Sequence, residues 1–479
     1  MRKQKSEPAV VAQKPGNGTR PDPLERRAGR GQNSAKGNAP RTESRTSVST
    51  RLSRIAELSR KHPESAHTTL AHHIDEEFLK EAWRRTRKDG AAGADGATAA
   101  DYAANLDANL RELLGRFKLG TYRAPPVRRV HIPKANGKTR PIGIPAFEDK
   151  VLQRAVTMVL EAVYEPEFIE GSYGFRPGRS AHDALEAIRQ CLRGGHGGWV
   201  IEADIESFFD RLDHGHLREF LGKRVKDGVI VRAIGKWLNA GVLEAGQLFY
   251  PETGSPQGGV ISPMLANIYL HEVLDVWFTR EVQPRLRGRA ELVRYADDFV
   301  IMFQLQEDAE RVMEVLPKRF GKYGLTLHPA KTRIVDFKGP KGHEVDETRR
   351  STFDFLGFTH YWGKSLRNTW MVRRKTARDR LSRTIGRVWE WCKANRHLPL
   401  RVQHRSLVLK LHGHYGYFGV NGNERALRGL REATRRAWRY WLNHRGGKRR
   451  MTWPRYTALL AYFSLPYPRL VRSTVRDGD

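Results

Sequence analysis

Three aspartates in two separate segments carry the side chains that a phosphoryl-transfer site requires. Asp204 ends a short apolar run that begins at Trp199, and Asp297 and Asp298 lie between two further apolar runs. Phosphoryl transfer is served by two divalent ions about 3.5 to 4 Å apart, one activating the attacking hydroxyl and the other steadying the leaving group. Carboxylates are the hard oxygen ligands that such ions prefer. These aspartates are therefore the first candidates for a two-metal site.

Aspartates in such positions also have a plain structural explanation, because aspartate forms turns and caps helices. We assign that role to Asp210 and Asp213, which follow Asp204 closely. For Asp297 and Asp298 the apolar residues on both sides favour a metal site instead. Two charges at a buried sheet edge are costly unless cations neutralise them.

The elements that must position these aspartates are predicted from apolar periodicity. Residues 199–205 predict a strand, and residues 292–303 predict strand, turn and strand with Asp297 and Asp298 at the turn. Folding would then bring the two segments to one sheet edge. Helices are predicted over 149–163 and 181–192, from near residue 213, and after Gly258-Gly259. The middle third of the chain is therefore expected to be mixed α/β.

A hairpin is predicted earlier in the chain, over residues 128–144, RRVHIPKANGKTRPIGI. Asn136-Gly137 lies between two runs of alternating β type, and this dipeptide favours the tight turns that join antiparallel strands. Pro133 and Pro141 indicate exposed strand edges, because proline cannot donate a backbone hydrogen bond.

The composition indicates a polyanionic partner and a multidomain protein. The chain has 479 residues, with 85 Lys and Arg against 53 Asp and Glu, which gives a net charge of +32. Nucleic acid is the natural partner of such an excess. No apolar run of about 18 residues is present, so we expect a soluble, intracellular protein without a membrane partner. Cys191 and Cys392 are expected to be buried thiols, since two distant cysteines build neither a disulfide framework nor a zinc site.

Both ends of the chain are strongly basic. Residues 1–50 have few large apolar side chains and are predicted to form a disordered basic tail. After about residue 370 the pattern is predicted to be helical, and four arginines at three- and four-residue spacings share one helix face: Arg428, Arg431, Arg435 and Arg439. This stripe is either a solvated face or, with Trp438, Tyr440 and Trp441 beside it, a nucleic-acid surface.

Taken in order, eight sequence blocks resemble those of the bacterial group II intron reverse transcriptases, which are also intron maturases. The blocks are GAAGADG at 90–96, HIPKANGKTRPIGIP at 131–145, SYGFRPGRSAHDAL at 172–185, DIESFFDRLDH at 204–214, GSPQGGVISPMLANIYL at 254–270, RYADDF at 294–299, LHPAKT at 327–332 and FDFLGF at 353–358. The resemblance covers roughly residues 60 to 470. A single YADD would be weak evidence, whereas eight blocks in order make an accidental match negligible.

The resemblance implies an α+β fold of the right-hand polymerase type. The implied divisions are an N-terminal extension with fingers over 51–195, a palm with part of the fingers over 196–365, a helical thumb and maturase domain over 366–470, and a short tail over 471–479. The block GHYGYFG at 413–419 is the best landmark of the maturase region. Its aromatic residues and glycines could instead simply pack helices.

By motif position, Asp204 and Asp297 resemble the principal metal ligands, with Asp298 beside them and the Ile205 carbonyl as a further ligand. Two Mg²⁺ ions are implied. Four residues correspond to the family's nucleotide pocket, in which the aromatic one would act as a gate against the ribose 2′-hydroxyl: Lys134, Arg140, Phe209 and Gln257. Lys134 and Arg140 could equally be ordinary hairpin charges, Phe209 a core residue and the loop at Gln257 a plain turn.

Four further residues correspond to the region that contacts template and primer: Phe175, Arg176, Arg179 and Lys331. The turn at 175–178 could also be explained by local chain geometry, and Lys331 by ordinary surface exposure. The expected enzyme is an RNA-directed DNA polymerase that also binds its intron RNA and promotes splicing and mobility.

The implied partners are intron RNA, an RNA template with a DNA primer, deoxynucleoside triphosphates and target DNA. Only eleven residues follow Pro468. We therefore expect no C-terminal endonuclease and priming from an existing DNA 3′ end. The expected location is the bacterial cytoplasm, with association to the nucleoid during action on DNA. Three alternatives are a domesticated or defence-associated reverse transcriptase, an RNA-binding splicing factor without polymerase activity, and a generic basic RNA-binding protein.

Overall fold

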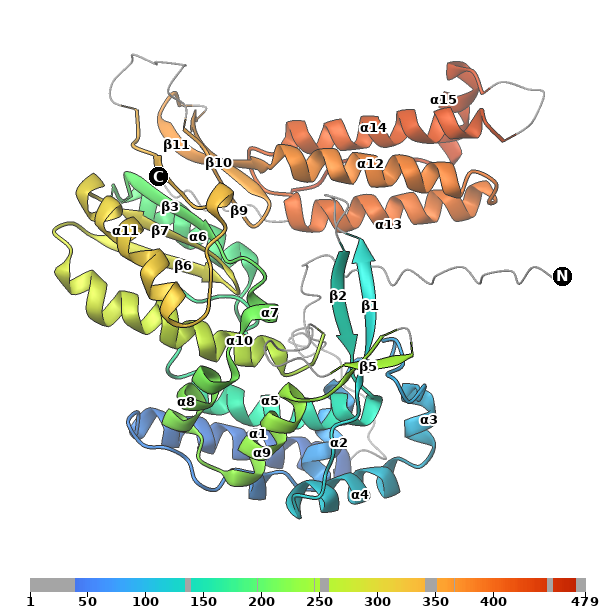
Figure 1. Ribbon diagram of the computed structural model, residues 1–479. Helices are drawn as coiled ribbons and strands as arrows, with labels where there is room; N and C mark the ends of the chain where they lie inside the picture. Colours follow the sequence, from blue (N-terminus) through green and yellow to red (C-terminus); the bar gives the residue numbers. More distant parts are fainter. Residues whose placement is uncertain are drawn as a thin grey trace. The chain divides into compact units, whose positions relative to one another are not determined.

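The computed structural model describes residues 39–470, apart from 134–138, 196, 245, 250–257, 341–350, 366 and 446–450. These residues form two compact units that divide between Asp336 and Phe337. Figure 1 shows their helices and strands coloured along the chain. Each unit is described by itself below.

The first unit holds most of the helices. They are α1 Ala39–Lys61, α2 Glu76–Arg85, α3 Ala99–Ala104, α4 Leu106–Lys118, α5 Phe147–Tyr164, α6 Ala181–Arg193, α7 Phe208–Arg211, α8 His214–Arg224, α9 Gly228–Leu238, α10 Ser262–Leu270 and α11 Gln306–Lys322. A π-helix, η3 His271–Val282, continues α10, and short 3₁₀ turns are η2 Ala71–His73, η4 Gln283–Arg285 and η5 Pro329–Lys331.

One sheet of the first unit has the order β6-β7-β3-β8 and is antiparallel throughout. Its strands are β3 Trp199–Asp204, β6 Ala290–Tyr295, β7 Asp298–Phe303 and β8 Arg333–Asp336. The two apolar runs of the sequence therefore pair as predicted. Helix α11 packs on this sheet, and Phe320 stacks on Phe299 of β7 with ring centroids 5.8 Å apart.

A second sheet in this unit has the order β2-β1-β4-β5. Its strands are β1 Val127–Pro133, β2 Thr139–Ile144, β4 Val242–Glu244 and β5 Gln247–Phe249. The predicted hairpin is confirmed by the antiparallel pairing of β1 with β2, from Arg128 opposite Ile144 to Pro133 opposite Thr139. The turn with Asn136-Gly137 lies outside the described residues.

Helix α5 is the centre of the helical layer of this unit. Helices α1 and α2 both pack on it, and most of its side chains are buried. Helix α1 begins at Ala39, inside the segment predicted to be a disordered tail, so that prediction is wrong for residues 39–50. The physical reason is an apolar face that begins before residue 51, since Val48 and Ile55 are both 1% exposed in the core.

Among its described residues, the second unit combines a small sheet with four helices. The sheet has the order β11-β10-β9, and the elements are β9 Phe353–Phe355, β10 Phe358–Lys364, β11 Trp370–Thr376, α12 Arg378–Ala394, α13 Leu400–Phe418, α14 Glu424–Leu442 and α15 Trp453–Tyr462. Helices α12 and α13 both lie along α14 (Figure 1). The predicted helical character after residue 370 is wrong for 370–376, where Val372, Arg374 and Thr376 alternate inward as in a strand.

The border between the units falls before the boundary predicted between residues 365 and 366. In the part of the chain that the structure describes, the strands β9 to β11 pair only with one another, and the Trp362 indole donates to the Phe337 carbonyl at 2.9 Å. These contacts attach the small sheet to the second unit.

The α+β class is confirmed, and Cys191 and Cys392 are buried thiols as predicted. None of the helices in the described ranges is long and apolar enough to cross a membrane.

Candidate active site

The register of β3 and β7 brings two of the candidate aspartates together. Asp204, the last residue of β3, lies opposite Asp298, the first residue of β7. Asp297 precedes it in the tight turn between β6 and β7, where Ala296 has a left-handed backbone with φ of 57°. The separated segments therefore meet at one end of the sheet, as their apolar flanks predicted.

Two of the three aspartates have a raised pKa, to which neighbouring carboxylates contribute. Burial, with a contribution from the charge of Asp204, raises the pKa of Asp297. Burial, followed by the charges of Asp297 and Asp204, raises the pKa of Asp298 to about 7. The Asp298 side chain is open to solvent, yet the surrounding protein and its two acidic neighbours outweigh that exposure. Such a group of acids is relieved by bound cations.

A lysine ammonium already lies beside this group. Lys331 Nζ contacts Asp204 Oδ2 at 2.5 Å. The Asp204 carbonyl accepts from the His328 amide at 2.8 Å, and the Glu206 amide donates to the Thr326 carbonyl at 2.8 Å. The peptide of Ile205, between these two bonds, is thereby fixed next to Asp204.

The carboxylates of these aspartates fit a divalent ion in their chemistry, although their positions do not form a complete coordination site. Within the described ranges, no three His, Cys, Asp or Glu side chains are close enough together to form a metal site. Asp204, Asp297 and Asp298 nevertheless supply hard oxygens whose mutual repulsion a divalent cation would remove. Lys331 engages one oxygen of the Asp204 carboxylate.

A buried arginine fixes the turn that carries Asp297. Arg294 is fully buried and donates to both oxygens of Asp275, at 2.8 and 2.5 Å. Its remaining donors reach the carbonyl of Ala296 at 3.1 Å and the side chains of Asn267 and Ser172 at 3.0 and 2.9 Å. Sequence reasoning missed this network. Its only signal was a charged residue inside an otherwise apolar strand.

The loop that begins the SYGFRPG block lies directly against the same turn. The Tyr173 amide donates to the Arg294 carbonyl, and Asn267 Nδ2 donates to the Gly174 carbonyl at 2.7 Å. A Cβ at Gly174 would lie 2.3 Å from the Ala296 nitrogen, so only glycine allows this approach. Phe175 extends from the loop with 53% of its surface exposed, 6.5 Å from the Tyr295 ring.

The other two residues of this loop that were predicted to contact the template differ in the exposure of their side chains. Arg176 is only 7% exposed, and its guanidinium engages Glu165 and the carbonyls of Ile169 and Ser172. These contacts favour a role in holding the loop rather than the predicted template contact. Arg179 is partly exposed and donates to the Glu170 carbonyl at 2.9 Å.

The structure describes two of the four residues that were predicted to bind the nucleotide. Lys134 and Gln257 lie outside the described residues. Arg140 lies on β2, opposite Ile132, and its positive charge opposes the rise in the pKa of Asp297, which places it within electrostatic reach of the aspartates. Phe209 is partly exposed and makes an edge-to-face contact with the buried Phe208, with ring centroids 5.3 Å apart.

The structural role expected for Asp213 is confirmed. Asp213 caps α8 by accepting from the His216 amide at 2.8 Å, as predicted. Asp210 lies in the first turn of the short helix α7.

In the second unit, two distant sequence blocks meet. The Tyr417 hydroxyl donates to the Leu356 carbonyl at 2.9 Å, and the Phe358 ring lies 4.9 Å from the Phe418 ring. Gly357 has a φ of 81°, which favours glycine in that turn. The aromatic residues of GHYGYFG therefore pack against the FDFLGF turn.

The arginine stripe on α14 is largely occupied by the C-terminal segment. Arg431 stacks on Tyr467 at 3.8 Å and donates to the Leu465 carbonyl. Arg439 stacks on Trp453 at 4.1 Å and donates to the Met451 carbonyl at 3.2 Å. Arg435 pairs with Glu432 at 2.8 Å, while Arg428 is exposed. Arg428 is therefore the member of the stripe that is most open to an RNA.

The chain is similar to the reverse transcriptase family and to proteins named for introns. The profile of the reverse transcriptase (RNA-dependent DNA polymerase) family matches residues 132–360. Protein YkfC of Escherichia coli (strain K12) is 36% identical over 300 residues, which cover 54% of this chain and 76% of YkfC. Nuclear intron maturase 2, mitochondrial, of Arabidopsis thaliana is 27% identical over 237 residues, which cover 41% of this chain and 30% of that protein.

A third relative is named as a group II intron-encoded protein. Group II intron-encoded protein LtrA of Lactococcus lactis subsp. cremoris is 39% identical over 221 residues, which cover 44% of this chain. The matched part spans 37% of LtrA, so the similarity concerns little more than a third of that protein.

Proposed function

The chain belongs to the reverse transcriptase family, and from this premise we propose that it copies RNA into DNA by two-metal phosphoryl transfer. The observation that carries the proposal is the meeting of Asp204 with Asp298 at the end of the sheet, with Asp297 in the adjoining turn. The pKa values of Asp297 and Asp298 are both raised, first by burial and then with a contribution from the charge of Asp204.

The aspartates would hold the magnesium ions. Asp204, Asp297 and Asp298 would supply the carboxylates, and the carbonyl of Ile205, the residue after Asp204, would be a further ligand. When bound, the ions neutralise developing charge and activate the primer hydroxyl. Lys331 contacts Asp204 and can pass to a phosphate of the primer or nucleotide when the ions bind. Arg140, on β2, binds the triphosphate of the incoming deoxynucleotide.

Phe209 contacts the sugar of the incoming nucleotide, and Phe175 contacts the template. Phe209 is partly exposed beside the buried Phe208, where its ring would meet a ribose 2′-hydroxyl and favour deoxynucleotides. Phe175 is exposed on the loop held against the Ala296 turn, and it offers an aromatic surface to a template base. Arg179 is near it and can contact a template phosphate.

The divisions of a right-hand polymerase can be assigned on these elements. We assign the palm to the β6-β7-β3-β8 sheet with α10 and α11, the fingers to the β1-β2 hairpin with the surrounding helices, and the thumb and maturase region to the second unit. This assignment uses the order of elements along the chain and implies no arrangement of the two units.

We further propose that the protein is the maturase of a group II intron. The similarity to LtrA, which is named as a group II intron-encoded protein, supports this proposal. The proposed partners are the intron RNA, an RNA template with a DNA primer, and the target DNA of intron mobility. The net charge of +32 supports binding to such polyanions.

The test is deoxynucleotide incorporation on a DNA-primed RNA template with Mg²⁺. Asp297→Asn should reduce incorporation by at least about 10³-fold, because removing a transition-state contact of this kind has a cost of that order. The variant should keep its melting temperature and its affinity for RNA. A wild type that folds and binds RNA but incorporates no nucleotide would overturn the polymerase proposal, and splicing assays would then test the maturase activity alone.

A further inference from the structure

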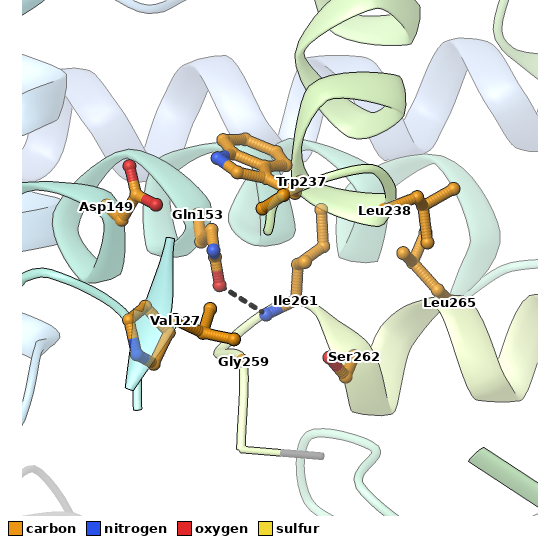
Figure 2. A pocket seen from close by; sticks show the side chains of 11 residues that line it. Val127, Asp149, Gln153, Trp237, Leu238, Gly259, Ile261, Ser262 and Leu265 are labelled. Atoms are coloured by element: carbon orange, nitrogen blue, oxygen red, sulfur yellow. Dashed lines mark hydrogen bonds between the residues drawn. The ribbon is translucent and has the colours of Figure 1, made fainter. Parts of the chain in front are cut away.

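A glutamine in the core of the first unit bonds to the turn that precedes α10. Gln153 lies in the middle of α5 and is 3% exposed. Its side-chain oxygen accepts from the Val260 amide at 2.8 Å and from the Ile261 amide at 3.4 Å. Figure 2 shows Gln153 pointing from α5 toward the start of α10, with its bond to Ile261 drawn as a dashed line.

The N-terminus of α10 has no side-chain cap of its own, and Gln153 connects its N-cap residue to α5. Ile261 is the N-cap residue, and its apolar side chain forms no capping hydrogen bond. Buried backbone N–H groups at a helix start must find an acceptor. Gln153 provides that acceptor from a position 107 residues earlier in the chain than Val260.

The opposite side of the same turn is held against the fingers hairpin. Gly258 has a φ of 119°, and a Cβ there would lie 2.4 Å from the Gly143 carbonyl oxygen on β2. Arg140 is on that same strand. The turn at 258–261 therefore lies between β2 and α5, and it is in contact with both.

The space around Gln153 leaves little freedom for the turn. A small cavity with room for about one water molecule is lined by Gln153, Gly259 and Ile261, and by Asp149 one helical turn before Gln153 (Figure 2). The neighbouring side chains are mostly apolar. Without the Gln153 side chain, the amides of Val260 and Ile261 would lose their acceptor, and the cavity beside Ile261 has room for about one water.

We propose that Gln153 is a positioning residue of the nucleotide site: it fixes the turn at 258–261 against β2, so that the backbone of Gly258 and Gly259 keeps its place relative to Arg140. This inference rests on the proposed function, in which Arg140 binds the triphosphate of the incoming deoxynucleotide. Gln153 itself does not touch the nucleotide. Its effect is therefore expected in nucleotide affinity rather than in RNA binding.

The test compares two substitutions of Gln153 that have nearly equal length. Gln153→Met removes the acceptor and should raise the KM for deoxynucleotides about tenfold, because two buried donors lose their partner. The kcat should change less than the KM. Gln153→Glu keeps a carbonyl oxygen in place and should restore a KM within about threefold of the wild type.

A matched control lies one turn further along the same helix. Thr157 is buried, and its hydroxyl donates to the Gln153 backbone carbonyl at 2.7 Å without touching the turn. Thr157→Val should lower the melting temperature but leave the KM unchanged. A KM that is unchanged in Gln153→Met, or that rises equally in Thr157→Val, would overturn the positioning role.

Amide hydrogen exchange separates this inference from the proposed function. In Gln153→Met the Val260 and Ile261 amides should exchange about tenfold faster or more, while Thr157→Val leaves them protected. A wild type without polymerase activity would overturn the proposed function and the nucleotide role together. If the Gln153→Met enzyme is active and its Val260 and Ile261 amides exchange at the wild-type rate, only the positioning role of Gln153 would be overturned.

Discussion

Arg294 and Asp275 form an ion pair in which neither side chain is exposed to solvent. The pair is bidentate, with distances of 2.8 and 2.5 Å. The same guanidinium donates to the Ala296 carbonyl, one residue before Asp297. The candidate metal turn is thus tied to the π-helix η3, which carries Asp275.

Removing one partner of this pair should damage both stability and catalysis. Asp275→Asn leaves the buried Arg294 charge uncompensated, which typically costs about 3 to 5 kcal/mol. We expect a melting temperature lowered by several degrees. We also expect polymerase activity reduced by about tenfold or more at temperatures where the variant is folded, because the Ala296 turn loses its fixed donor.

The first unit provides a matched control. Arg287 and Glu307 form a pair at 3.1 Å, and their side chains are 73% and 71% exposed. Glu307→Gln should change stability by less than about 1 kcal/mol, because solvent screens the pair. Equal effects of Asp275→Asn and Glu307→Gln in calorimetry would contradict the role assigned to the buried pair.

The arginines of α12 and α14 should contribute differently to RNA binding. Arg383 and Arg387 are exposed on α12, and within the described residues neither pairs with a carboxylate, although Arg383 donates to the Asp379 carbonyl. Burial, followed by the positive charges of Arg383 and Arg387, lowers the pKa of Arg380 on the same helix. By contrast, Arg431 and Arg439 on α14 hold the C-terminal segment.

The measurement is RNA affinity as a function of salt, for structured RNA and for a primed template. The wild type should lose about 10³ to 10⁵ in affinity between 50 and 200 mM salt if it contacts six to ten phosphates. The double variant Arg383→Gln, Arg387→Gln should reduce the slope of log K against log salt by about 1 to 2. Arg431→Gln with Arg439→Gln should change the slope by less than about 1 and lower the melting temperature instead. The reverse pattern would assign the RNA surface to α14.

Substitutions of the neighbouring residues Phe208 and Phe209 should have different effects: one on stability, the other on the choice between deoxynucleotides and ribonucleotides. Phe209 is partly exposed, whereas Phe208 is 2% exposed in the core. Phe209→Ala should raise ribonucleotide incorporation relative to deoxynucleotides by at least about tenfold, because the site loses a steric clash. Phe208→Ala should cost about 3 to 5 kcal/mol of stability through its cavity. Unchanged discrimination in a folded Phe209→Ala enzyme would remove Phe209 from the nucleotide site.

The sequence predicted those parts of the site that depend on local patterns. The apolar runs ending at Asp204 and surrounding Asp297 predicted β3, β6 and β7, because strand periodicity is visible within a few residues. The hairpin of β1 and β2 was predicted in the same way from Asn136-Gly137. In each case the information lies within one short segment.

The sequence did not predict contacts that depend on tertiary packing. Asp275 is 19 residues from Arg294, in a π-helix whose periodicity is not recognisable from the sequence, and Gln153 is 107 residues from Val260. The strand at Trp370–Thr376 was missed because its basic residues obscured the alternation. The burial of Arg176 was missed because its partner Glu165, the C-cap residue of α5, is 11 residues away in the sequence.

The stability of the first unit should depend on pH through Asp149. This residue is 1% exposed and accepts a hydrogen bond from the Tyr122 hydroxyl, to which the Trp237 indole donates at 2.9 Å. Burial raises the pKa of Asp149 to about 7, while the bond from Tyr122 opposes the rise. The ordinary pKa of aspartate in an unfolded chain is about 3.9.

Between pH 4 and about 7 the folded protein therefore holds a proton on Asp149 that the unfolded chain has released. The free energy of unfolding should fall as pH rises through this interval and level off above it. Asp149→Asn removes the titration and keeps an oxygen for Tyr122. The melting temperature of the wild type, relative to this variant, should therefore decrease from pH 5 to pH 8 and then stay constant. A difference that does not change with pH would show that Asp149 is ionised throughout and that its carboxylate is solvated better than its burial indicates.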